Sequence, residues 1–136
     1  MTKFETIFNL CGSAMVTFFC LVFGGWDMWI KVLLGVIVVD YITGVMSAWE
    51  RGTLSSRIGA KGICKKIMIL AIVALACWLD QLLGATGALR AMAIGFYIAN
   101  DSLSIIENAA AIGLNVPKGL VDKLEQLKEQ NDGSQK

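Results

Sequence analysis

The chain has 136 residues, of which 56% are hydrophobic and 17% are charged, and its net charge is +1. A domain of this length buries too small a fraction of its surface to hide so much apolar area, which excludes an ordinary soluble protein. The composition and the mean hydropathy of +0.64 therefore predict a membrane protein. The near-neutral charge gives no indication of a nucleic-acid partner, and we predict none.

The residues that most enzymes need are missing from this sequence. It contains no histidine, and its four cysteines are scattered without CxxC spacing. No GxSxG motif and no cluster of metal-ligand residues occurs. We predict that the chain is not an enzyme and that it uses no cofactor and no metal.

The first predicted element is an uncharged run at 6–26, which is long enough to cross about 30 Å of hydrocarbon. A signal peptide is the alternative interpretation. Lys3 is the only basic residue before the run, and no small-x-small cleavage site precedes a polar mature start, so we favour a retained helix. The pair Gly24-Gly25 with Asp27 then predicts a tight turn.

Further along, the predicted elements are a second apolar span at 28–49, a polar glycine-rich loop at 50–62, a third span at 63–83, a turn at 84–87 and a fourth span at 91–114. We therefore predict an all-α membrane protein with four transmembrane helices. The longest uncharged cores of the third and fourth spans are shorter than a full crossing. Each of these spans must hold a carboxyl at or inside the hydrocarbon edge, Asp80 in the third and Asp101 in the fourth.

The end of the chain is polar. Leucines recur there at helical spacing among charged residues, namely Leu120, Leu124 and Leu127. They predict a short amphipathic helix at 117–130, followed at 131–136 by a polar tail that we expect to be disordered. Residues 1–116 would be the transmembrane domain, and residues 117–136 would lie in the cytoplasm.

Basic residues gather in two places. One group surrounds the loop after the second span: Arg51, Arg57, Lys61, Lys65 and Lys66. The other group follows the fourth span: Lys118, Lys123, Lys128 and Lys136. Four spans place both groups on one side, and the positive-inside rule then puts both termini in the cytoplasm of the bacterial host. The loop residues could also contact anionic lipid head groups, which the sequence does not separate from a role in topology alone.

Polar residues inside the fourth span share one face. At 100° per residue, an arc of about 120° holds Asn100, Asp101, Ser104, Glu107 and Asn108. A charged side chain at the bilayer centre costs about 2.5–3.5 kcal/mol. This polar stripe must therefore face neighbouring helices, another copy of the chain, or water, and we interpret it as an oligomerisation or lumen-lining surface.

Small residues at four-residue spacing predict close helix contacts. On the second span they lie below a carboxyl, in the series Asp40, Gly44 and Ala48. On roughly the opposite face of the fourth span from the polar stripe, they are Ala91, Gly95 and Ala99. Two contact faces on one helix suit an assembly of many chains, although a crowded monomer could use both. The carboxyls could equally be protonated or hydrogen-bonded inside one compact bundle.

Two segments resemble a phage holin family that includes the toxin-secretion holins of clostridia. The first is DYITGVMSAWERGTLSSRIGAKGICKK at 40–66, and the second is NDSLSIIENAAAIGLNVPKGLVDKLEQLK at 100–128. Asp101 stands where the family usually has glutamate, which keeps the charge. The resemblance runs from about residue 28 to residue 130, and it does not cover the first span.

This resemblance implies that the chain accumulates in the bacterial inner membrane and assembles with copies of itself into lesions. Such lesions release endolysin, a functional partner without direct contact, or collapse the proton-motive force. An antiholin is a further partner that the resemblance allows. Four other functions stay open: an antiholin or regulator with the same fold, a toxin-export holin, a small ion or solute transporter, and a structural membrane subunit. The sequence has no pair of broken inverted repeats, which argues against the transporter.

Overall fold

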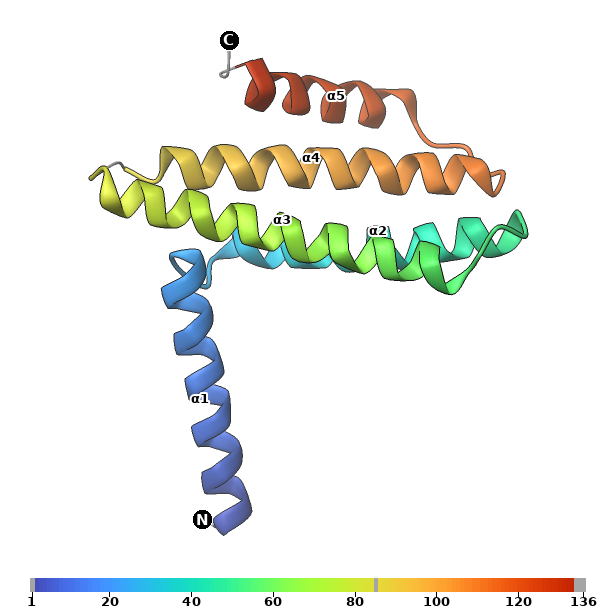
Figure 1. Cartoon of the computed structure of the whole chain (residues 1–136). Helices are drawn as coiled ribbons and strands as arrows, with labels where there is room; N and C mark the ends of the chain where they lie inside the picture. The colour runs from blue at the N-terminus through green and yellow to red at the C-terminus, as the bar shows by residue number, and fades with distance from the viewer. Residues whose placement is uncertain (1, 85, 134–136) are drawn as a thin grey trace.

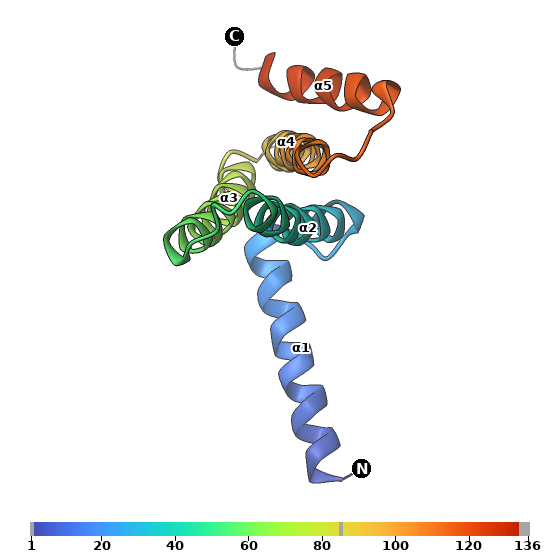
Figure 2. The ribbon, with the colours of Figure 1, turned by 90° about the vertical axis from the view of Figure 1, so that its right-hand side faces the viewer.

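A computed structural model describes residues 2–84 and 86–133, and over these ranges every regular element is a helix. In chain order the helices are α1 (Lys3–Phe23), α2 (Met28–Glu50), α3 (Ser56–Leu82), α4 (Ala88–Ala111) and α5 (Lys118–Gly133). The all-α prediction is confirmed (Figure 1). Figures 1 and 2 show α4 lying over α2 and α3, with α5 on the far side of α4 and α1 projecting from the opposite side of the α2–α3 layer.

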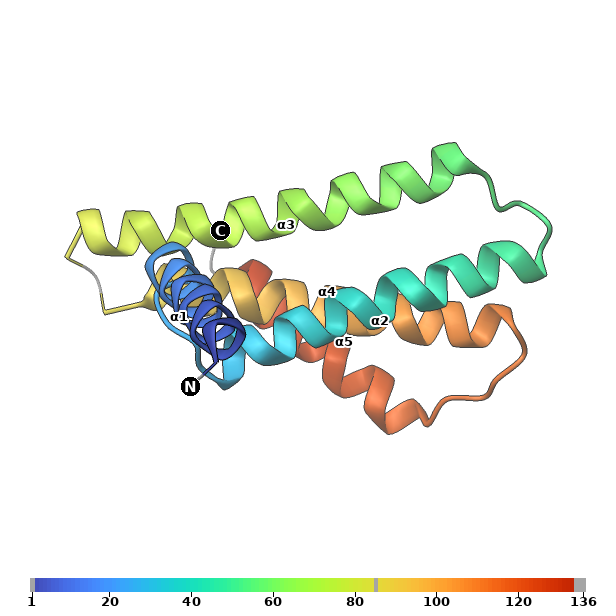
Figure 3. The same ribbon diagram turned by 90° about the horizontal axis from the view of Figure 1, so that it is seen from below.

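Helix α1 stands apart from the other helices, and in Figure 3 it is seen nearly end-on against α2, α3 and α4. It begins with a capping box, in which Thr2 and Glu5 satisfy each other's backbone N–H groups. It ends at Gly24, whose φ of 78° is left-handed and favours glycine. Phe23 is the one residue of α1 that is buried in the described chain. Phe19 and Val22 are partly buried beside it, and the helix before Phe19 is exposed along its whole length.

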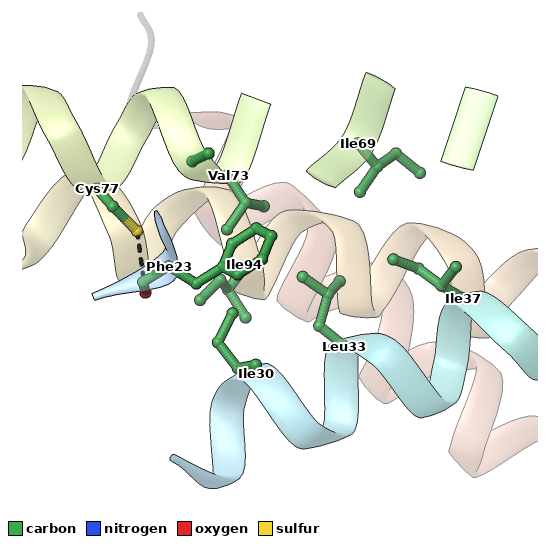
Figure 4. Packing of buried hydrophobic residues seen from close by; sticks show 9 residues of the cluster. Phe23, Ile30, Leu33, Ile37, Ile69, Val73, Cys77 and Ile94 are labelled. Atoms are coloured by element: carbon green, nitrogen blue, oxygen red, sulfur yellow. Dashed lines mark hydrogen bonds between the residues drawn. The ribbon is translucent and has the colours of Figure 1, made fainter. Parts of the chain in front are cut away.

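The core lies where α2, α3 and α4 meet the C-terminal end of α1 (Figure 4). Four of its side chains have no exposed surface, and they come from three helices: Ile30, Leu33, Val73 and Ile94. The outward faces of α2 and α3 carry exposed apolar side chains such as Val39 and Ile67. An apolar outside around a small apolar core is the pattern expected of helices that meet lipid.

The predicted loop at 50–62 is wrong over its second half, because α3 already begins at Ser56. The Ser55 hydroxyl caps the helix by accepting a hydrogen bond from the backbone N–H of Ile58 at 3.2 Å. The glycines that suggested a loop serve helix packing instead. A Cβ on Gly62 would lie 3.1 Å from the ring of Tyr41, and the Tyr41 hydroxyl donates to the Gly59 carbonyl at 3.3 Å.

Three of the described helices are long and apolar enough to cross a membrane: α1, α2 and α3. The fourth predicted span is not among them, so four transmembrane helices are not confirmed. Helix α4 begins three residues earlier and ends three residues earlier than predicted, and it carries Arg90, Asp101 and Glu107. These charges lower its mean hydropathy.

Helix α5 confirms the predicted C-terminal helix and extends it to Gly133. The expectation of disorder from residue 131 is therefore wrong for 131–133, while 134–136 lie outside the described residues. Helix α5 runs beside α4 and approaches it at Gly95, where an added Cβ would lie 3.1 Å from the amide of Asn131. Its leucines are only partly covered, since Leu120 is 51% exposed.

Candidate functional site

An ion cluster joins the three packed helices near their middle. Lys66 of α3 donates hydrogen bonds to Oδ2 of Asp40 on α2 and to Oδ2 of Asp101 on α4, the latter at 2.8 Å. The side chains of Asp40 and Asp101 are 10% and 2% exposed, and that of Lys66 is 16% exposed. We call Asp40, Lys66 and Asp101 the three-helix ion cluster.

The three-helix ion cluster holds two carboxylates and one ammonium, so its formal charge is −1 when every group is ionised. Amide and hydroxyl groups beside it provide further hydrogen bonds. Asn108 of α4 donates to Asp40 Oδ1 at 3.4 Å and to Thr43 Oγ1 at 3.1 Å. Gly44 lies beside this amide, and a Cβ there would be at ordinary contact distance, 3.7 Å from Asn108 Nδ2. Buried charge is tolerated only with such partners.

Two hollows flank the ion cluster. One, of about 200 Å³, is lined by residues that include Tyr41, Gly44, Ser104 and Asn108. The other, of about 430 Å³, is lined by residues that include Lys61, Tyr97, Asn100 and Asp101. Both hollows reach Asp40 and Lys66. Each is large enough for water and has the polar partners that bound water requires.

A second polar junction holds α1 against the bundle. The Arg90 guanidinium binds both carboxylate oxygens of Asp27, at 2.9 and 3.0 Å, and Arg90 Nε donates to the Phe23 carbonyl at 2.6 Å. The Cys77 thiol donates to the same carbonyl at 3.2 Å. These bonds satisfy a carbonyl at the end of α1 and fix the turn that follows it.

Asp80 lies on α3, and its side chain caps the start of the neighbouring helix α4. Its carboxylate accepts the backbone N–H groups of Leu89 at 3.1 Å and Arg90 at 2.8 Å. The N-cap residue of α4, Gly87, has no side chain that could do this. The buried carboxylate also meets the positive end of the α4 dipole. Asp80 thus has a structural role as a helix cap.

Acid is expected to loosen the α1 junction. The hydrogen bond from Arg90 lowers the pKa of Asp27 below its ordinary value of 3.8. A depressed folded-state pKa means that this ion pair contributes fully above pH 3.8 and is lost as the pH falls through the lower folded value. Spin labels on exposed positions 15 and 67 report how firmly α1 is held. The distribution of distances between them should stay narrow from pH 7 to 4 and broaden at lower pH. Asp27→Asn should broaden it at every pH; a wild-type distance unchanged at pH 2 would contradict the prediction.

The structure separates the residues of the predicted polar stripe. Asp101 is buried in the ion cluster, and Asn108 is half-buried with partners on α2. Asn100 and Ser104 are half-buried beside the hollows, while Glu107 is exposed and has no polar partner among the described residues. Part of the stripe is therefore satisfied inside one chain.

The small residues of the predicted contact faces lie in different surroundings. Ala48 and Ala99 are buried, and Gly44 faces Asn108. Gly95 is buried against α5, whereas Ala91 is exposed. Of the predicted basic loop, four residues are exposed: Arg51, Arg57, Lys61 and Lys65.

Sequence reasoning missed that Lys66 belongs to the site, because it was assigned to the basic loop. Once α3 begins at Ser56, Lys66 lies in its third turn, at the level of the other charged residues. The serine cap at Ser55 was the signal that could have moved the helix start and revealed this. The roles of Arg90 and Asp27 were also missed, since they join positions 63 residues apart.

Comparison with known proteins decides the family. The sequence profile of the bacteriophage holin family matches residues 17–129. The chain belongs to the bacteriophage holin family. This confirms the resemblance seen in the two motifs, and it extends the similarity back to the last turns of α1. The family is one of membrane pore-forming proteins rather than enzymes.

Proteins similar to this chain occur in a Bacillus phage and in Clostridium and Listeria. A probable holin of Bacillus phage phi105 is 35% identical over 104 residues, covering 76% of this chain and 77% of the phage protein. An uncharacterized 14.9 kDa protein of Clostridium perfringens is 41% identical over 90% of this chain and 96% of its own length. An uncharacterized protein of Listeria monocytogenes is 45% identical over 83% and 79%. No solved structure matches this chain.

Proposed function

We propose that the chain is a phage holin, which gathers in the bacterial inner membrane and opens lesions at host lysis. The lesions would release endolysin and collapse the proton-motive force. Family membership and the similarity to a probable holin of Bacillus phage phi105 support this function. The observation that carries the mechanism is the buried bridge from Lys66 to Asp40 and Asp101, which an inert membrane anchor would not need.

The ion cluster holds each chain closed before lysis. With Lys66 bound to both carboxylates, Asp40, Asp101 and Asn108 have polar partners inside one chain. The excess negative charge makes this state only marginally favourable in a membrane. When the helices separate, Asp101 and Asn108 need new partners, which sister copies or water can provide. Gathering of many copies would then favour a hydrated lumen.

All four helices α1–α4 would cross the membrane in this proposal, with both termini in the cytoplasm. The internal pairing of Asp101 and Asn108 lowers the cost of burying α4, despite its low hydropathy. Helix α1 would have to turn into line with the other helices at Gly24 and Gly25, which requires the Arg90 bonds to the Phe23 carbonyl and to Asp27 to rearrange. The two basic groups then fall on the cytoplasmic side.

Helix α5 would act as a cytoplasmic regulator or as a contact between chains. In the structure it lies beside the face of α4 that contains Gly95, inside the proposed fourth span, so a cytoplasmic α5 would have to leave this face when α4 crosses the membrane. Deleting residues 118–136 should shift the time of lysis. An unchanged time would show that this segment is a soluble tail without a regulatory role.

Expression of the chain alone tests the proposed function. In a bacterial host we expect arrest of growth and loss of membrane potential at a defined time after induction. When an endolysin is expressed with it, a cytoplasmic reporter protein of known size should appear in the medium. A frameshifted gene is the matched control. An antiholin would instead delay lysis by a second holin, and a transporter would conduct without arresting growth.

A further inference from the structure

Helix α1 carries one polar face along an otherwise apolar surface. The face forms a shallow groove lined by Phe8, Asn9, Gly12, Ser13, Val16 and Thr17. The Ser13 and Thr17 hydroxyls donate to carbonyls of their own helix, to Asn9 and Ser13 respectively, each at 2.8 Å. The side-chain amide of Asn9 is different, because no described residue offers it a hydrogen bond. Helix α1 contacts the bundle only near its end, around Phe23.

The depth of Asn9 makes this unpaired amide costly. A helix of 21 residues is about 32 Å long, close to the thickness of the hydrocarbon core. Asn9 lies six residues after Lys3, about 9 Å along the axis, so its amide falls within the hydrocarbon when α1 crosses the membrane. Lipid tails cannot hydrogen-bond, and unsatisfied polar groups in hydrocarbon are strongly unfavourable. Lipid can therefore cover the rest of α1 but not this face.

We propose that the polar face of α1 binds the same face of α1 in a second copy, with the two helices parallel. A carboxamide both donates and accepts, so two Asn9 side chains are complementary to each other. Gly12 and Ser13 are small and allow the backbones to approach. The helices are parallel because every copy has the same topology. This inference rests on the proposed membrane crossing of α1, but the contact can form without lysis.

Native cysteines provide the matched control for a cross-linking test. Cys11 lies about 160° around the helix from Ser13, on the side away from the proposed contact. Two full-length chains are compared. In both, Cys20 and Cys64 are replaced by alanine, and Cys77 is retained because it is buried. One keeps Cys11. The other combines Cys11→Ala with Ser13→Cys. Membranes are oxidised with copper phenanthroline at low expression, before any loss of potential.

We expect disulfide-linked dimers from the Ser13→Cys chain and several-fold less from the chain with Cys11. Adding Asn9→Leu should lower the dimer fraction about three- to tenfold, whereas Asn9→Gln should retain most of it. Equal cross-linking at both positions, or no effect of Asn9→Leu, would overturn the interface even in a chain that lyses cells. Cross-linking through the Ser13→Cys position in a chain that never lyses cells would keep the interface and reject the holin function.

Discussion

Replacing Lys66 by methionine is expected to lower the stability of the folded chain by about 3–5 kcal/mol. The change removes the ammonium that Asp40 and Asp101 share, and it leaves two buried carboxylates facing each other. Methionine has a similar length, so packing changes little. The measurement is the unfolding free energy of the purified protein in mild detergent. The same variant should arrest growth earlier than the wild type, because the closed state is weakened.

Lys65→Met is the matched control for this prediction. Lys65 is the adjacent residue, but it is exposed and makes no ion pair with a described residue. Its replacement should change the unfolding free energy by less than about 0.5 kcal/mol. Combining Lys66→Met with Asp40→Asn and Asp101→Asn should recover much of the lost stability. If the two single variants unfold alike, the ion cluster does not hold the helices together.

Replacing Asp101 by asparagine is expected to have the opposite effect, namely to delay lysis. Asparagine keeps an oxygen that can accept from Lys66, while the formal charge of the cluster changes from −1 to 0. Removing one excess buried charge would favour the closed state by about 1–2 kcal/mol, which corresponds to a factor of about 5–30 in the ratio of closed to open chains. The time from induction to loss of membrane potential measures this shift.

Glu107→Gln serves as the control for stability, because it removes a carboxylate from the same helix at an exposed position. It should leave the unfolding midpoint unchanged, whereas Asp101→Asn should raise it. Lysis by Asp101→Asn at the wild-type time or earlier would show that excess charge in the cluster does not drive opening. Together with Lys66→Met, the series spans formal charges of −2, −1 and 0 at one site. Lysis should come later at each step toward neutrality.

Much of the architecture could be predicted because it depends on local pattern. Apolar runs of about 20 residues, glycine turns and the spacing of Leu120, Leu124 and Leu127 each specify a helix within one segment. The start of α3 was missed because Gly59 and Gly62 resemble loop residues. Their helical setting depends on Tyr41, which lies on another helix. Glycine indicates a loop or a close contact equally well until its neighbour is known.

The sequence by itself determined the membrane class, the all-α content and the position of polar residues on each helix, because composition and periodicity are properties of single segments. The holin family followed from the resemblance of two sequence motifs to that family. Only the tertiary structure decided which polar residues meet. Lys66 bonds partners 26 and 35 residues away, Asp80 caps a neighbouring helix, and α1 projects from the bundle. These pairings depend on the rotation and tilt of one helix against another. Packing around Ile30, Leu33, Val73 and Ile94 sets both, and no local pattern encodes them.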